Sequence, residues 1–239
     1  GVRTDTSWFK VELSNYSGED ARTIKTTEYE DAARTIIKKI DLQENITRDI
    51  NDNISSYLLT SSKYSGGVKQ SDKYFKVELS NYDGDNATTI KTTEYTDLTR
   101  STIKKIDLQA NITRDANENI TSYNLTTTEY KLGVPQPDKW FKVELSNYVG
   151  DNATTIKTTE YENSLRTIRK KIDTQTNITR DTNDNITSYS LTTEEFAGGV
   201  RTDTSWFKVE LSNYSGEDAR TIKTTEYEDS TRTLIKKVD

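Results

Sequence analysis

The sequence predicts an all-β protein, an extended tandem array of 66-residue units in which each unit is an antiparallel β-meander of about five strands. The segment Phe9–Tyr16 recurs 66 residues apart, without insertion or deletion, at Phe75–Tyr82, Phe141–Tyr148 and Phe207–Tyr214. Within it, Phe9, Val11 and Leu13 alternate with polar residues, which is the period of a strand with one apolar face. Thr, Ile, Val and Tyr, which favour strands, supply much of the remaining sequence.

The fixed period predicts four units rather than one or two globular domains. The expected units are residues 1–66, 67–132 and 133–198, with a partial unit at 199–239. Residues 1–31 and 199–229 are identical, including polar positions where packing does not demand identity. We therefore expect this chain to be a segment of a longer array, joined to its neighbours head to tail either covalently or by strand completion.

The first half of each unit predicts a β-hairpin. One strand is expected at about Trp8–Tyr16 and a second at about Arg22–Glu30, with Gly18 in the turn between them. The polar stretches that precede the first strand (residues 3–7, 69–73, 135–139 and 201–205) predict linkers or sheet edges. Pro135 and Pro137, the two prolines of the chain, lie in one of these stretches.

The third element, at about Arg34–Leu42, is interpreted as a strand. The spacing of Ile36, Ile37 and Ile40 is also helical, so a short helix remains the alternative. The abundance of Thr and Ser in this segment across the units favours the strand.

The second half of each unit contains two predicted turns. Asp41–Asn45 is expected to lead into a short strand at Ile46–Arg48, and Asp49–Asn53 into a longer strand at Ile54–Leu59. Asn tolerates the left-handed conformation that short loops need. A link at Ser61–Gly66 would then close the unit.

The pattern of Asp41, Asn45-Ile-Thr, Asp49, Asn53-Ile-Ser and Tyr57 resembles bacterial YD or Rhs-type repeats, which place Asn-Ile/Leu-Thr after tight turns. Where that family usually has Gly before the Asn, this chain has Glu44 and Asp52, and its repeat is longer. The chain as a whole is similar in style to tandem-repeat extracellular adhesins and fibres. This resemblance implies an extracellular or cell-surface location.

Composition excludes several classes of function. Charged residues make up 30% of the chain and both signs are interspersed at a net charge of −6, so the basic stripe that nucleic-acid binding requires is missing. Cys and His are absent, which removes thiol chemistry and the usual general base. The sequence contains no apolar run of about 18 residues, the length that would predict a membrane-spanning helix. We expect no catalytic residue and no cofactor.

A calcium loop is the alternative to a plain turn at Asp49–Asn53, because Asp49, Asn51 and Asn53 fit the start of the D-x-[DN]-x-[DN] pattern. The later Gly and bidentate Glu are replaced by Ile54 and Thr60, so a turn without metal is favoured. The corresponding candidate ligands in the next two units are Asp115 and Asn119, then Asp181 and Asn185.

N-glycosylation acceptors are the second candidate sites, since Asn-x-Ser/Thr occurs twice in each complete unit at corresponding positions. The six candidates are Asn45, Asn53, Asn111, Asn119, Asn177 and Asn185. The alternative is that each Asn is a turn residue that precedes a β-branched strand start. Of the other recurring residues, Lys38-Lys39 predicts a solvated strand face, and Trp8, Trp140 and Trp206 predict packing or, alternatively, stacking on sugars.

These observations favour a structural protein, a segment of an extracellular fibre or filament whose partner is a further copy of itself. The alternative is a carbohydrate- or surface-binding adhesin that uses the same array to bind surface glycans. An enzyme or a closed, propeller-like domain is the third alternative. The tests follow from these alternatives: filaments in native material, glycan binding, or turnover.

Overall fold

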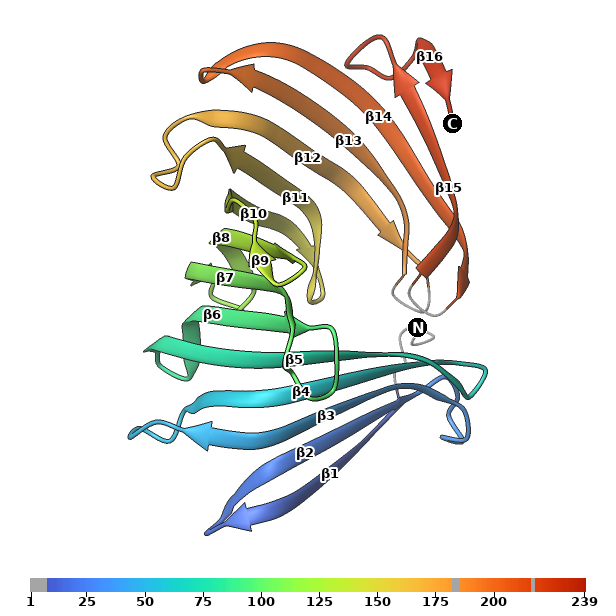
Figure 1. Cartoon of the computed structure of the whole chain (residues 1–239). Coiled ribbons are helices and arrows are strands. Elements are labelled where there is room, and N and C mark those ends of the chain that lie inside the picture. Colours follow the sequence, from blue (N-terminus) through green and yellow to red (C-terminus); the bar gives the residue numbers. More distant parts are fainter. Residues whose placement is uncertain (1–7, 182–184, 216–217) are drawn as a thin grey trace. The chain divides into compact units, whose positions relative to one another are not determined.

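The computed structural model describes residues 8–181, 185–215 and 218–239. These residues form β-strands joined by turns, and they contain no helix, so the predicted all-β class is confirmed. The strands lie in an open antiparallel sheet in which strands that follow one another in the sequence lie side by side (Figure 1). The chain divides into two compact units, Gly1–Ala110 with Thr127–Asp138 and Asn111–Thr126 with Lys139–Asp239.

The first unit begins with β1 and runs in chain order to β6. Its strands are β1 (Trp8–Ser17), β2 (Asp20–Tyr29), β3 (Ile37–Arg48), β4 (Ile54–Ser65), β5 (Val68–Asp83), β6 (Asn86–Tyr95) and the short β9 (Val134–Pro135). β7 (Ile103–Arg114) and β8 (Ile120–Lys131) contribute residues to both units.

The second unit contains the remaining strands, again in chain order. They are β10 (Lys139–Val149), β11 (Asn152–Tyr161), β12 (Arg169–Arg180), β13 (Ile186–Ala197), β14 (Val200–Ser215), β15 (Asp218–Tyr227) and β16 (Ile235–Val238). Corresponding strands of the chain begin 66 residues apart, as Asp20, Asn86, Asn152 and Asp218 do in β2, β6, β11 and β15. The recurrence of strands expected from the sequence is therefore present.

The predicted hairpin is confirmed. Ser17 pairs with Asp20 at the end of β1 and β2, which leaves a two-residue loop with Gly18 at a φ of 65°. The second loop residue, Glu19, is not among the residues with a positive φ, so the loop has the geometry of a type II′ turn, whose twist suits a hairpin. Gly adopts the positive φ of its first position without a steric penalty.

The second half of the repeat departs from the prediction of about five strands, because four strands cover residues 8–65. The predicted turn at Asp41–Asn45 is wrong, since β3 runs unbroken from Ile37 to Arg48. Asn45 has the expected left-handed φ of 54°, yet it lies where the β3–β4 register shifts, between Glu44 and Thr47. The Asn therefore makes a β-bulge instead of a turn. The helical alternative for residues 34–42 is also wrong.

Three predicted linkers also prove to be strand, including residues 201–205, which belong to β14. β4 continues to Ser65, so the link reduces to a turn at Gly66 and Gly67, and β5 includes the polar residues 69–73. The stretch with the two prolines differs, because there the strand is interrupted between β9 and β10. Proline has no N–H to donate to a neighbouring strand, which accounts for this break. Residues 3–7 lie outside the described residues.

Burial in this sheet is shallow, and no large side chain among the described residues is fully buried. Val77, Val143 and Val209 are buried at corresponding positions of β5, β10 and β14, on the face that the alternation in the sequence marks as apolar. Several apolar residues of the first repeat are exposed in the structure, namely Phe9, Val11, Leu13, Tyr16 and Ile36. A side chain in one sheet layer is shielded mainly by the strands on either side of its own.

Candidate functional site

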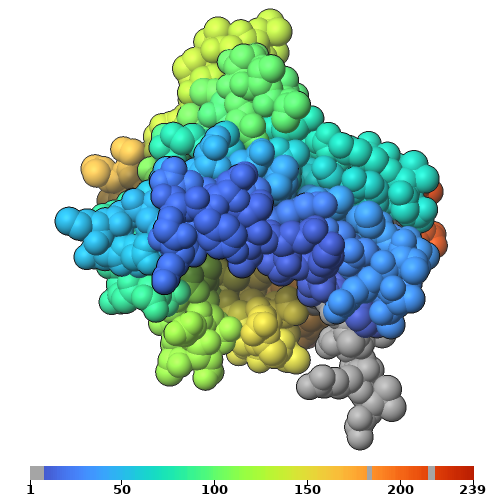
Figure 2. Space-filling view, turned by 90° about the horizontal axis from the view of Figure 1, so that it is seen from below, coloured from blue at the N-terminus to red at the C-terminus, as the bar shows by residue number. Residues whose placement is uncertain are grey.

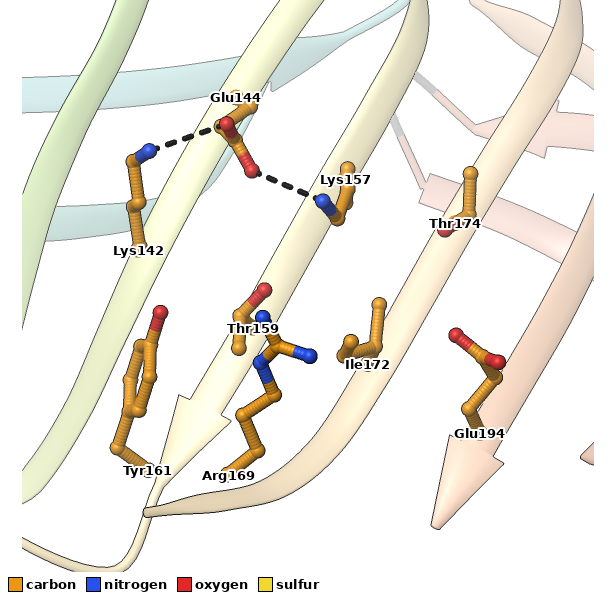
Figure 3. A pocket seen from close by; sticks show the side chains of 9 residues that line it. All are labelled: Lys142, Glu144, Lys157, Thr159, Tyr161, Arg169, Ile172, Thr174 and Glu194. Carbon is orange, nitrogen blue, oxygen red and sulfur yellow. Dashed lines mark hydrogen bonds and ion pairs between the residues drawn. The ribbon is translucent and has the colours of Figure 1, made fainter. Parts of the chain in front are cut away.

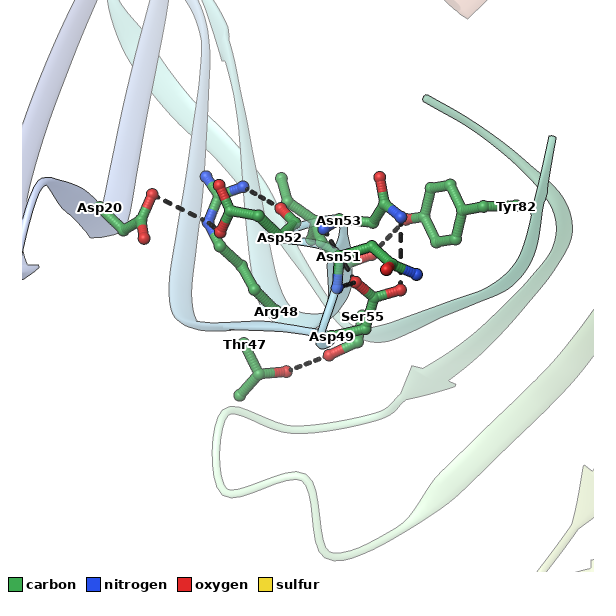
Figure 4. A network of polar contacts seen from close by, with 10 residues as sticks. Asp20, Thr47, Arg48, Asp49, Asn51, Asp52, Asn53, Ser55 and Tyr82 are labelled. Carbon is green, nitrogen blue, oxygen red and sulfur yellow. Dashed lines mark hydrogen bonds and ion pairs between the residues drawn. The ribbon is translucent and has the colours of Figure 1, made fainter. Parts of the chain in front are cut away.

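The turn between β3 and β4 contains a network of polar side chains (Figure 4). The Asp49 Oδ1 atom accepts hydrogen bonds from the backbone N–H groups of Asn51 at 2.9 Å and Asn53 at 3.0 Å. Its Oδ2 atom accepts from the Asn53 side-chain amide at 3.4 Å. The Asp49 carboxylate thus holds the turn together, as Asp does in Asx-turns.

The residues around this turn connect it to neighbouring strands. The Arg48 Nε atom lies 3.2 Å from Asp20 Oδ1 of β2, and Arg48 also donates to the backbone carbonyl of Asp52 at 2.6 Å. The Tyr82 hydroxyl, from β5, donates to the carbonyl of Ile54. The same hydroxyl contact recurs from Tyr148 to Ile120 and from Tyr214 to Ile186.

The candidate calcium ligands form hydrogen bonds within their own turns. Asp115 accepts from the side chain of Asn119 and the backbone N–H groups of Asn117 and Asn119, which lowers the pKa of its carboxyl despite partial desolvation. Asp181 accepts from Asn185 in the same way. Within the described ranges, no three carboxylates gather where they could hold a metal ion. These hydrogen bonds favour the turn interpretation, and the calcium alternative stays a prediction to be tested by chelation.

The six glycosylation candidates separate into two environments. Asn45, Asn111 and Asn177 are exposed and share a left-handed φ of 53° to 55°, and the register shifts beside Asn45 and Asn177 mark β-bulges in β3 and β12. By contrast, Asn53, Asn119 and Asn185 are half-buried and their amides are hydrogen-bonded to the turn aspartates. If the sequons are modified, the bulge positions are therefore the accessible acceptors.

An arginine clamp, defined as Arg100, Arg166 and Arg232, joins the loop before each third strand to two earlier strands. Arg232 Nε donates to the Phe207 carbonyl of β14 at 3.2 Å, and its NH2 group donates to the Leu191 carbonyl of β13 at 3.2 Å and to Thr192 Oγ1 at 3.0 Å. Arg100 and Arg166 repeat these contacts with the corresponding residues. A single guanidinium thus connects the loop to two neighbouring strands of the sheet.

The clamp was not among the residues that sequence reasoning selected. The available signal was an Arg at the same position in every unit, at residues 34, 100, 166 and 232. Each of these arginines has a positive φ, between 54° and 58°, which is uncommon for a residue with a side chain. A recurring Arg in an otherwise variable loop was therefore the clue.

The lysine pairs contact carboxylates of neighbouring residues or strands. Lys38 Nζ lies 2.8 Å from Glu28 Oε1, and Lys39 Nζ lies 3.0 Å from Asp41 Oδ2. The same two ion pairs recur in the later repeats. The predicted solvated face is therefore covered with ion pairs between side chains that are mostly partly exposed, each of which contributes little stability alone.

A pocket of about 430 Å³ lies on the polar face of the second unit (Figure 3). At one end of it, the Glu144 carboxylate lies 3.1 Å from Lys142 Nζ and 3.2 Å from Lys157 Nζ. The full lining is Lys142, Glu144, Lys157, Thr159, Tyr161, Arg169, Ile172, Thr174 and Glu194. Such a lining of charges with one aromatic ring can form hydrogen bonds with a polyhydroxylated ligand.

Three residues make this pocket more polar than the equivalent surface of the other repeats. Arg169, Thr174 and Glu194 stand where the first repeat has Ile37, Leu42 and Ser62 and the second has Ile103, Leu108 and Thr128. Trp8 and Trp140 lie at the beginning of β1 and β10, whereas Trp206 lies within β14. Trp140 is half-buried opposite Tyr161 in the β10–β11 register. These positions are compatible with both packing and ligand stacking.

Comparison of the chain with protein-family models and with curated proteins finds no match. The described residues contain no helical segment that is long and hydrophobic enough to span a membrane.

Proposed function

We propose that this chain is a structural segment of an extracellular or cell-surface fibre, built as an extended array of 66-residue β repeats. The observation that carries this proposal is the recurrence of strands at 66-residue spacing together with the arginine clamp. The clamp fastens the loop of one repeat to the last strand of the repeat before it, so stabilising contacts pass from repeat to repeat. Nearest-neighbour contacts of this kind are typical of repeat arrays.

Electron microscopy of native material tests the proposal directly. A fibre predicts thin, extended particles whose length grows with the number of repeats. Compact particles of uniform size would contradict it. Stretching single molecules without any ligand provides a second measurement, in which repeated units give a regular series of unfolding events.

A surface-binding adhesin is the second candidate, and the polar pocket of the second unit favours it. Tyr161, Arg169 and Glu194 would contact a glycan there. The matched variants are Tyr161→Ala, which removes the aromatic ring, and Tyr95→Ala, which removes the corresponding ring of the previous repeat. On a glycan array, the adhesin proposal predicts binding that only Tyr161→Ala abolishes. Equal loss in both variants, or no binding by the unaltered chain, contradicts a pocket-specific role.

Metal and glycan attachment are tested separately. The turn hydrogen bonds of Asp49 and Asp115 support stability without calcium, so EDTA should leave the melting temperature unchanged. In a chain of this size, a loss of one kcal/mol lowers the melting temperature by about 2–4 °C. A fall of more than about 10 °C on addition of EDTA would therefore assign a metal to these turns. Intact mass of native material tests glycosylation, which we expect at Asn45, Asn111 and Asn177 before the other sequons.

A further inference from the structure

β1 has an uncovered edge that differs from every equivalent strand described here. Its apolar face is exposed at Phe9, Val11 and Leu13, whereas the equivalent Val209 of β14 is only 6% exposed and Val11 is 59% exposed. β14 is paired on one side with β13 and on the other with β15, while β1 is paired with β2 alone among the described residues. Figure 1 shows β1 as the outermost strand, and Figure 2 shows the dark-blue residues of this region on an open face.

The residue that would fasten a missing neighbour is already in place. Arg34 has the same loop geometry as the clamp arginines, with a φ of 57° and a backbone N–H bond to Asp31 at 3.1 Å, against 58° and 3.2 Å for Arg232 and Asp229. In the described part of the chain, however, the exposed Arg34 guanidinium makes none of the clamp contacts. Its expected partners are the Phe9 carbonyl and a strand on the open side of β1.

From these two observations we propose that the β1 edge and Arg34 form an acceptor site for one β-strand with the sequence of β13, supplied by a preceding repeat of the same array. This inference rests on the proposed structural function. The occupant is identified by sequence identity, because Trp8–Ser17 of β1 is identical to Trp206–Ser215 of β14. In β14, that sequence pairs with residues 188–192 of β13, which places Leu191 opposite Phe207 and Tyr189 opposite Val209.

A second copy of this chain does not offer such a strand. Its β4 and β13 are each hydrogen-bonded on both sides. Its other edge strand, β16, corresponds to β3 and β12, which pair with strands of the β2 and β4 kinds and never with a strand of the β1 kind. Joining two copies edge to edge would therefore need a register that the sheet does not use. A covalently preceding repeat provides the right strand without unfolding anything.

The direct experiment adds a copy of residues 185–198 in front of Gly1, so that the natural Gly-Gly turn joins it to β1. We expect at least tenfold slower amide hydrogen exchange in β1, because its outward N–H groups gain strand partners. Leu191→Asp within the added copy is the matched control and should abolish the gain, since it places a charge against Phe9. Unchanged exchange in β1 with the correct copy overturns the proposal.

Arg34→Ala separates the acceptor site from a general effect of a longer chain. In the extended chain it should reverse a substantial part of the protection, because two of the three clamp bonds go to the added strand. In the chain without the extension it should leave β1 exchange unchanged. Equal effects in both backgrounds contradict a role for Arg34 in strand capture.

Two further measurements distinguish this inference from the function on which it rests. Binding of a labelled peptide of residues 185–198, followed by fluorescence anisotropy, reports the acceptor site even if electron microscopy finds no fibre. Fibres in native material without any capture of the strand, in the peptide and extension experiments alike, overturn the inference alone. Concentration-dependent oligomers of the unextended chain that exchange this strand would assign the site to a second copy and overturn the choice of occupant.

Discussion

β1 and β14 contain the same ten residues, yet they lie in different environments. Val11 of β1 is largely exposed, whereas Val209 of β14 is buried. Tyr214 donates a hydrogen bond to the Ile186 carbonyl of the neighbouring β13, whereas β1, which contains Tyr16, is paired with β2 alone within the described part of the chain. The sequence of a strand therefore does not determine its burial in a single sheet layer. The strand beside it does, because each side chain is shielded by its neighbours on the same face.

The largest difference between β14 and β1 is expected when a charged residue replaces the valine at position 209 or at the equivalent position 11. Val209→Asp should destabilise its unit by about 3 kcal/mol or more, because the carboxylate would be buried without a partner. Val11→Asp should cost less than about 1 kcal/mol, because the site is already solvated. Urea unfolding of both variants measures the difference. Equal losses would show that β1 is covered in solution.

The arginine clamp gives the next largest contrast. Arg232→Ala removes three hydrogen bonds and leaves the Leu191 and Phe207 carbonyls without that donor, so we expect a loss of about 1–3 kcal/mol. Arg34→Ala should change stability by less than about 0.5 kcal/mol. Thermal unfolding of the two variants makes the comparison, and a large effect at Arg34 would reveal a partner on the β1 side.

A smaller effect is expected at Asp41. Its Oδ1 atom is buried and has no hydrogen-bond partner among the described residues, while the equivalent Asp107 and Asp173 accept from Thr127 and Thr193 at 2.7 Å. The first repeat has Ser61 at that position. Ser61→Thr should restore the bond and stabilise the chain by about 1 kcal/mol. The reverse change, Thr193→Ser, is the control and should destabilise it by a similar amount.

The smallest effect is a local pH dependence in the loops that carry the clamp arginines. A hydrogen bond from the Thr99 hydroxyl, with further hydrogen bonds from Ser101 and Thr96, lowers the pKa of the Asp97 carboxyl to about 2. Partial desolvation acts in the opposite direction and is the smaller effect. Because this folded-state pKa lies below the usual 3.8, the stabilisation is complete above pH 3.8 and disappears as the pH falls through about 2. Asn163 occupies the equivalent position and bonds to Thr167 without a titrating group.

Nuclear magnetic resonance checks this last expectation. Amide shifts of residues 97–101 should titrate at low pH while those of residues 163–167 stay constant. In the Asp97→Asn variant the first loop should become as insensitive to pH as the second. Titration of both loops together would instead indicate global acid unfolding.

The sequence by itself determined the all-β class, the 66-residue recurrence of strands, the hairpin at Gly18 and the polar and apolar faces. These features follow from side-chain alternation and from turn residues, which act over a few positions. The left-handed conformation at Asn45 could also be inferred, because Asn tolerates it. Whether that conformation makes a turn or a bulge depends on the facing strand, so the prediction of a turn there was wrong.

Only the tertiary structure decided the features that involve residues far apart in the chain. The clamp joins Arg232 to Leu191, 41 residues away, and no local pattern encodes that contact. The polar pocket exists because Glu144, Arg169 and Glu194 come from three strands that the sheet places together. The ten-residue sequence that β1 and β14 share is largely exposed in β1 and more deeply buried in β14. The physical reason is that neighbouring strands shield a side chain from water, so the sequence of one strand does not determine how far its side chains are buried.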